Sequence, residues 1–551
     1  MRRQFSRSGA LKAWGMAGLV LAGATSAAAQ TQTTARGPVT TRVPVTMEEP
    51  NLPRQEGAIL LSLEDAVELA VRRNLGLVIE RYVRTQSELG VRQALGIYDT
   101  QLNAFASATD QASPPVSAFT ASTFAQQQLN AQLVQSLPTG GQVSAGWQNS
   151  RTESNTNFLS PAYSSGLTFS FAQPLLRDFG AGAFERQLLI ARNQNLGSGQ
   201  EFSRQVIATL QQVTDAYWNL VESHEQLKVA RQSLSLAQEL HERNRIQVEV
   251  GTLAPLELVQ SEANIATNEE EIIRTQTLVG DAEDELRRLL NLPQGELWQL
   301  EIRPATDPGS ENTPTDLEAA IRQALDTRPE IRAQRLQVDL ARAEASYFRN
   351  QTLPTLDLNL NYGLSGNNAV TVGFDQAGNP IRIPGNYGDA VDQLTGFDFD
   401  TWTASLTFGF PLQNRTARAA KAIADLDLEQ AETTLEQLEQ SVITEVRQAA
   451  RRLDSAAKQI EAARASVRFQ ERSLDAERKR YENGMSSSFE ITRIQQDLTA
   501  ARSREVSAII AYRTAVTQLQ RVTGQLLTTY GLAIDDPETP IQRWSFFARN
   551  R

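Results

Sequence analysis

Two stretches without glycine or proline stand out in the second half of the chain. The first covers 412–483 and the second covers 485–523, with Gly484 between them. Such runs favour helix, because glycine and proline are the residues that interrupt it. Along the first run, apolar residues recur at steps of three or four, with one longer gap, at positions 428, 431, 435, 438, 442, 446, 449, 453, 456, 460, 463, 467 and 474. One face of this helix is therefore predicted to pack against partner helices, and the two runs to form an antiparallel hairpin that turns at Gly484.

The chain contains an internal duplication. Residues 63–70 and 317–324 share leucine, glutamate and two alanines at a shift of 254 positions. At a shift of 233 positions, Gly251 corresponds to Gly484 and Glu257 to Glu490. Repeats of this kind indicate two copies of one structural unit. Each copy is predicted to hold an opening helix (63–96 and 317–350), strands, a long helix (183–249 and 412–483), a glycine tip and a shorter helix (252–290 and 485–523). The glycines between 195 and 199 are predicted to kink or locally open the first long helix.

The segments between opening and long helices alternate apolar and polar residues with period two, which indicates strands. These segments are 102–106 and 167–171 in the first half, and 356–362 and 402–410 in the second. Two strand pairs cannot close a barrel, for which about eight strands is the lower limit, so several copies are predicted to share one. Aromatic residues near the strand ends fit either membrane-interface girdles or ordinary strand positions: Tyr98, Trp147, Phe171, Tyr362, Trp402 and Phe410.

The first half has an additional strand pair, 127–137 and 142–148, joined at Thr139, Gly140 and Gly141. Glycines between two alternating segments are a hairpin signal. The pattern leaves open whether this pair extends the barrel or forms a hairpin outside it. The stretch between Gly363 and Phe399 is rich in Gly, Asn and Asp and is predicted to be a loop facing water.

The first 29 residues have a basic start, an apolar middle and alanines at 27–29, as expected for a secretory signal peptide. A buried N-terminal helix is the alternative. Residues 30–58 lack periodicity and are predicted to be an extended leader. The formal net charge of −11 argues against nucleic acid as a partner, because binding it needs basic surface. The chain has no cysteine, which excludes disulfides, thiol chemistry and lipid attachment through an N-terminal cysteine.

No pattern predicts a catalytic, cofactor or metal site. His224 and His241 are 17 positions apart, whereas two ligands on one helix need a spacing of four. The segment Gly180-Ala181-Gly182 lacks the third glycine of a dinucleotide-binding loop and is interpreted as a turn. No serine, histidine and acid constellation suggests a hydrolase.

The arrangement resembles the TolC family of outer-membrane efflux channels. The resemblance rests on the duplication, the strand-to-helix entries at 171–175 and 410–412, and the tips at 249–253 and 481–485, and it covers about 59–524. It implies a first repeat at 59–300, a second repeat at 313–524 and a C-terminal tail at 525–551. The implied fold is mostly α, a homotrimer with a twelve-stranded transmembrane β-barrel, four strands from each copy, continuous with a periplasmic α-helical barrel. The implied function is a passive exit duct of a tripartite efflux pump or type I secretion system.

The resemblance also implies partners and a gate. A periplasmic adaptor and an inner-membrane pump or ABC exporter would dock, with the adaptor contacting the tip turns at Gly251, Thr252, Leu253, Gly484 and Met485. Family channels often carry acidic residues just after the tip, and these positions are Glu257 and Glu490 here. Arg493 stands where a second aspartate can follow, which implies a mixed ring. Tyr481 and Glu257 form a candidate closed-state latch. For each of these four side chains the alternative is an ordinary solvated residue near a helix turn.

A periplasmic coiled-coil adaptor or scaffold without a pore is the competing interpretation, because its helices would carry the same pattern. Adaptors usually contain a lipoyl-like or barrel module and an inner-membrane anchor, and neither is recognisable in this sequence. A periplasmic enzyme is a third possibility, but no set of catalytic residues in the sequence supports it.

Overall fold

The computed structural model describes residues 54–55, 57–114, 122–155, 160–309 and 316–532. The predicted signal peptide and nearly all of the predicted leader lie outside these ranges, as does most of the predicted C-terminal tail. Within the described residues, no helix carries an apolar stretch long enough to cross a lipid bilayer.

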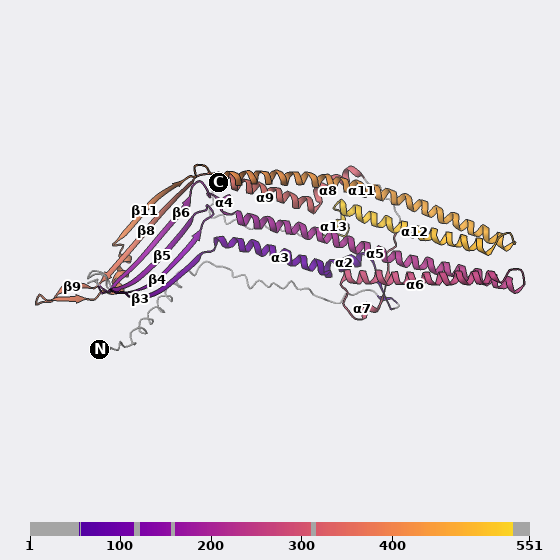
Figure 1. Ribbon diagram of the computed structural model, residues 1–551, viewed down its shortest axis with the longest axis horizontal. Helices are drawn as coiled ribbons and strands as arrows, with labels where there is room; N and C mark the ends of the chain where they lie inside the picture. Colours follow the sequence, from indigo (N-terminus) through magenta and orange to yellow (C-terminus); the bar gives the residue numbers. More distant parts are fainter. Residues whose placement is uncertain (1–53, 56, 115–121, 156–159, 310–315, 533–551) are drawn as a thin grey trace. The chain divides into compact units, whose positions relative to one another are not determined.

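Two long helices organise the fold, α5 (Arg186–Glu249) and α11 (Arg415–Glu482). Each turns back into a shorter antiparallel helix, α6 (Leu256–Leu290) and α12 (Ser488–Val522), so the two predicted hairpins are confirmed (Figure 1). Helix α5 continues through 195–199, where a kink or an opening was predicted. Packing explains the continuity, because Gly199 and Gln200 are buried and a glycine costs a helix only about 1 kcal/mol.

Each predicted opening helix is in fact two helices. The first half has α2 (Leu63–Arg73) and α3 (Leu75–Leu95), and the second has α8 (Leu317–Thr327) and α9 (Pro329–Gln351). The side chain of Asn74 caps α3 and donates to the carbonyl of Leu289 at 2.9 Å. In the second half, Pro329 disfavours helical backbone at the residue before it, which ends α8. Helices α3 and α6 pack along α5, and α9 and α12 along α11.

A small three-stranded sheet and a large core cluster lie among the helices of the first half, and Ile510 of α12 also belongs to this cluster. The sheet joins β1 (Arg54–Gln55), β2 (Ala58–Leu61) and β7 (Glu301–Pro304), with β2 and β7 parallel. Tyr217 is fully buried here; its hydroxyl donates to the Leu61 carbonyl at 3.1 Å and accepts from the Thr306 amide at 3.0 Å. Short helices α4 (Ala181–Phe184), α7 (Glu296–Gln299) and α13 (Leu526–Thr529) complete the helical part.

One antiparallel sheet of six strands continues from the ends of the helices (Figure 1). Its strands, in spatial order, are β11 (Asp400–Gly409), β8 (Thr355–Ala369), β6 (Ala162–Pro174), β5 (Gln142–Ser154), β4 (Thr123–Ser136) and β3 (Gln101–Ala112). The sheet of one chain therefore holds six strands, whereas the resemblance implies four barrel strands from each copy. The additional pair β4 and β5 lies inside this sheet, between β3 and β6.

The segment predicted to be a water-facing loop contains regular structure. It forms a hairpin of β9 (Thr371–Phe374) and β10 (Pro380–Ile383), followed by α10 (Tyr387–Gly396). Helix α10 packs on β8 so closely that a Cβ atom on Gly366 would lie 1.9 Å from the carbonyl oxygen of Ala390. A glycine read as a loop residue is thus a packing residue.

The two faces of the six-stranded sheet differ in chemistry. Residues that pair directly across antiparallel strands point to the same face, so the register assigns every side chain to one of the two faces. The polar face carries Gln, Asn, Ser and Thr at most positions, and Asp357 is its one charged residue within the strands. The apolar face holds nine of the ten large hydrophobic side chains of these strands that are exposed: Leu102, Leu129, Leu133, Val143, Phe169, Leu360, Trp402, Leu406 and Phe408. An exposed apolar area of this extent indicates contact with a partner or a lipid phase.

Candidate functional site

The two helix tips, at the ends of α5 and α11 far from the sheet, hold the residues singled out by the sequence (Figure 1). At the first tip the Gly251 amide donates to the Val248 carbonyl and the Thr252 amide to the Gln247 carbonyl, at 3.0 and 2.9 Å. The second tip repeats both bonds one repeat later: from Gly484 to Tyr481 and from Met485 to Arg480. This pair of bonds is the Schellman motif, which needs a left-handed residue. Both glycines provide it, with φ of 78° and 71°.

Tyr481 lies at the centre of a buried polar cluster that joins both tips. Its hydroxyl lies 2.8 Å from Oδ1 of Asn244 and 2.8 Å from Oε1 of Gln247, and its single proton goes to one of them at a time. The amide group of Asn244 is fully buried and donates to Oγ of Ser488 at 2.8 Å. The cluster therefore connects α5 with α11 and α12. An apolar cluster that includes Leu240, Leu474 and Ile491 surrounds it.

Glu257 lies near this cluster but is not hydrogen-bonded to Tyr481 within the chain. Burial first, and the charge of Glu257 second, raise the pKa of Tyr481 above its usual range, so the hydroxyl stays protonated at neutral pH. Oε2 of Glu257 is buried and finds no hydrogen-bond partner among the described residues. The charge of Glu257 thus acts on Tyr481, while the phenol proton of Tyr481 goes to Asn244 or Gln247.

Glu490 lies in the first turn of α12 and forms an exposed ion pair with Arg493 in the second turn. Arg493 contacts Oε2 of Glu490 at 2.8 Å and Asp497 at 3.6 Å. The amide of Glu490 is also bonded to Oγ of Ser487, 3.4 Å away, which caps the helix. Charge of both signs is therefore presented at one surface, which fits the mixed ring that the resemblance implies. Its pairing within one turn also fits the alternative, an ordinary solvated helix start.

Apolar side chains are exposed around both tip turns. Met485 and Phe489 are 63% and 64% exposed at the second tip, and Val250 and Leu256 are 68% and 63% exposed at the first. Leu256 and Phe489 occupy equivalent positions of the two repeats, five residues after the tip glycine. Exposed hydrophobic residues at the same place in both repeats indicate a contact surface.

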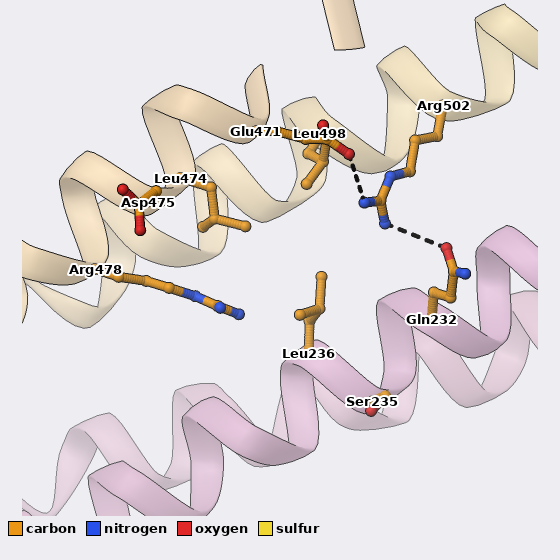
Figure 2. A pocket seen from close by; sticks show the side chains of 9 residues that line it. All are labelled: Gln232, Ser235, Leu236, Glu471, Leu474, Asp475, Arg478, Leu498 and Arg502. Atoms are coloured by element: carbon orange, nitrogen blue, oxygen red, sulfur yellow. Dashed lines mark hydrogen bonds and ion pairs between the residues drawn. The ribbon is translucent and has the colours of Figure 1, made fainter. Parts of the chain in front are cut away.

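Between α5, α11 and α12, nearer the middle of the hairpins, lies an open groove of about 360 Å³ (Figure 2). Arg502 extends across it and bonds Glu471 at 2.9 Å and Gln232 at 3.2 Å. Arg478 is 3.7 Å from Glu239. Because both cations already have partners, this groove offers no free charge for a ligand. Elsewhere in the described part of the chain, no three acidic or histidine side chains gather as a metal site.

Sequence reasoning identified Tyr481 and Glu257 but missed Asn244, Gln247 and Ser488. Asn244 and Ser488 are separated by 244 positions and become neighbours only when the two hairpins pack. The available signal was a polar residue within the apolar stripe of a long helix, which demands a buried partner.

The chain is similar to known outer-membrane proteins in sequence and fold. The sequence profile of the family described as Outer membrane efflux protein matches residues 101–292 and 320–525, which together make up more than half of the chain. No curated protein matches the chain.

Solved structures extend the likeness to the fold. The Campylobacter jejuni CmeC outer membrane channel is 14% identical, with a TM-score of 0.60 over 84% of this chain and 85% of its own. CusC is 18% identical, with a TM-score of 0.61 over 87% of this chain and 98% of its own. The open state of the Neisseria gonorrhoeae MtrE outer membrane channel is 16% identical, with a TM-score of 0.58 over 87% of this chain and 97% of its own.

Proposed function

The chain belongs to the outer membrane efflux protein family, and on that basis we propose that three copies form a passive exit duct that closes at its periplasmic helix tips. The coarser statement follows from the family itself: this is an efflux channel of the TolC type in the outer membrane, extending into the periplasm, and not an enzyme. Such channels form homotrimers and work with efflux pump partners.

The proposal of a duct rests on the difference between the two faces of the six-stranded sheet. Its polar face consists almost entirely of uncharged side chains, which suits a water-filled lumen with little charge selectivity. Its apolar face suits contact with outer-membrane lipid. The six strands are 10 to 15 residues long, and a tilted strand of about 9–11 residues crosses a bilayer. A periplasmic adaptor, the competing interpretation, would not require a sheet with one lipid-facing side and one water-facing side.

The closed state is proposed to depend on Tyr481 and Glu257, with Glu490 and Arg493 at the constriction. Oε2 of Glu257 is buried and has no hydrogen-bond donor among the described residues, and the charge of Glu257 acts on the Tyr481 phenol, which stays protonated. A hydrogen bond to a charged acceptor contributes about 1.5–3 kcal/mol, and three copies would multiply it.

The finer proposal on partners concerns the tip turns. A periplasmic adaptor would contact Gly251, Thr252, Leu253, Gly484 and Met485 and link the duct to an inner-membrane pump or ABC exporter. The exposed side chains of Met485 and Phe489 support this, because a wholly solvated turn would not present them. Photo-crosslinking from position 485 in intact cells is expected to capture a periplasmic adaptor, and a reaction confined to neighbouring copies of this chain would contradict the proposal.

Cell fractionation and the size of the purified protein test the duct directly. The processed chain is expected in the outer membrane, and its mass in detergent, after subtraction of bound detergent, is expected to equal three copies. A monomer recovered from the soluble periplasm would refute the proposal.

A further inference from the structure

We infer that all six strands of each copy enter the wall of the channel, so that β3 of one copy pairs with β11 of the next and three copies close a barrel of eighteen strands. The inference rests on the proposed homotrimer. It differs from the twelve-stranded wall that the family resemblance implies, and it commits both open edges of the sheet to one partner, a second copy of this chain.

The two edges need a partner and match each other. Among the described residues, strands β3 and β11 are each paired on one side only, which leaves a row of backbone donors and acceptors along the other. In lipid every such group must be bonded, so an open edge cannot remain. Because successive strands alternate in direction and the number is even, β11 runs towards the helices and β3 away from them. Pairing them between copies is therefore antiparallel, like every other pairing in the sheet.

Their side chains also continue one surface. On the apolar face, β3 presents Leu102, Ala104 and Ala106, and β11 presents residues of the same kind at 402, 404, 406 and 408; each strand has one aspartate on this face, Asp110 and Asp400, at its end away from the helices. On the polar face, β3 presents Asn103, Ser107 and Thr109 together with one exposed aromatic residue, Phe105, and β11 presents only threonine, serine and glycine. Joining the edges thus keeps lipid-facing and water-facing sides unbroken around the ring.

The additional hairpin is built into the wall. Strands β4 and β5 are 14 and 13 residues long, the same height as β6 with 13. Their turn is held against the connection from β6 to the helices: the Thr139 carbonyl accepts from the Gly180 amide at 2.9 Å and from Gln173 at 3.0 Å. A Cβ atom on Gly140 would lie 2.4 Å from the Asp178 carbonyl oxygen. The turn of β4 and β5 is therefore packed against the connection that follows β6.

Strand number sets what a barrel can enclose. Width grows with the number of strands at a given tilt, and barrels of about 16–18 strands enclose an aqueous channel. A wall of eighteen strands is therefore wider than one of twelve at the same tilt. The outer-membrane part of this duct is inferred to be more open than four strands per copy would allow.

Cysteine pairs can test the order of strands in the assembled trimer, because the natural chain has no cysteine to interfere. Ala104→Cys with Ala131→Cys joins directly opposed positions of β3 and β4. Ala104→Cys with Leu167→Cys reports on direct pairing of β3 with β6, which would occur only if the hairpin lay outside. Trp147→Cys with Leu167→Cys, directly opposed on β5 and β6, is the matched control for position 167.

A third set combines Ala104→Cys in turn with Trp402→Cys, Ala404→Cys and Leu406→Cys, all on the apolar face, and is analysed for covalent dimers and trimers. We expect crosslinks within the chain for 104 with 131, between chains for at least one pair of the third set, and none for 104 with 167. A crosslink for 104 with 167 in place of 104 with 131, or no crosslink between chains, in a particle of three copies would overturn the eighteen-stranded wall and leave the duct intact. A particle that is not a trimer would instead refute the proposed function.

Discussion

The hydroxyl group of Tyr481 lies 2.8 Å from Oδ1 of Asn244, a fully buried amide on the other long helix of the chain. This contact joins the two helical hairpins at the end of the duct that is proposed to open and close. Any movement that separates the tips of α5 and α11 must break it, and would leave a buried amide without a partner, at a cost of about 1–3 kcal/mol.

Removing the proposed latch is predicted to open the duct. In the double variant Tyr481→Phe and Glu257→Gln, the phenol proton and the carboxylate charge are both lost. A loss of about 1.5–3 kcal/mol per contact would shift the balance between closed and open states by about 10- to 150-fold. The measurement is the resting conductance of the purified trimer. An unchanged conductance would remove the latch and leave the channel intact.

Tyr217→Phe is the matched control for this experiment. It also removes a buried hydroxyl with two hydrogen bonds, but in the core beside the small sheet rather than at the tips. We expect it to lower thermal stability, again by about 1–3 kcal/mol, without changing resting conductance. If both variants raised conductance alike, the effect would be general loosening and not release of a gate.

The ion pair of Glu490 and Arg493 is predicted to tune ion selectivity rather than stability. Both side chains are more than 40% exposed, so solvent screens the pair and it adds little to stability. Arg493→Ala would leave Glu490 and Asp497 as unopposed negative charge, so the variant is expected to prefer cations more strongly. The reversal potential in a salt gradient measures this. No shift of the potential would place these residues away from the constriction.

Two glycines with similar backbone are predicted to tolerate alanine very differently. Gly140 and Gly251 have φ of 84° and 78°, so a side chain strains either by about 1–2 kcal/mol. At Gly251 nothing lies within 4 Å of the added Cβ atom, whereas at Gly140 it would clash with the Asp178 carbonyl oxygen. Gly140→Ala is therefore expected to reduce trimer yield and thermal stability well beyond Gly251→Ala. Equal effects would mean that the turn of β4 and β5 is not packed against the β6 connection.

A pH-dependent gain in stability is predicted for Asp215→Asn. Burial raises the pKa of the Asp215 carboxyl above 3.8, against a smaller opposing effect of the Gln211 hydrogen bond, and its Oδ1 has no hydrogen-bond partner in the described chain. The folded protein thus holds this proton more tightly than the unfolded chain does. The stabilisation from this bound proton is complete at pH values below the pKa of Asp215 in the unfolded chain. It is lost as the pH rises through the pKa of Asp215 in the folded protein. At pH 7 the carboxylate is charged and buried, which lowers the free energy of unfolding. Asparagine has no such charge.

We therefore expect Asp215→Asn to unfold at a higher temperature than the natural chain at pH 7, with the difference shrinking towards pH 4. Asp454→Asn, an exposed residue paired with Lys458, is the control and is expected to change little at either pH. A gain for Asp215→Asn that is the same at both pH values would show that the ionisation of this carboxyl is not its cause.

Local pattern predicted the helical hairpins well, because the signals are local. The turns at Gly251 and Gly484 need a left-handed residue, and the long helices need uninterrupted helix formers. The breaks at Asn74 and Arg328 were missed, although Pro329 gave a warning, because helical periodicity continues across both sites. At 195–199 the opposite occurred, and burial of Gly199 kept the helix intact.

What the sequence could not decide depends on partners distant in the chain. The alternation in 127–148 indicates a strand pair, but its neighbours β3 and β6 are set by the fold of the whole sheet. Likewise, Tyr481 alone does not reveal Asn244, which lies 237 positions earlier. These contacts belong to tertiary packing, and local periodicity carries no information about them.

Planar-bilayer recording from the purified trimer tests the central claim most directly. The account predicts small or rare conductance from the natural protein and large, discrete steps once Tyr481→Phe and Glu257→Gln are introduced together. Trimeric preparations of both proteins that never conduct ions would contradict it.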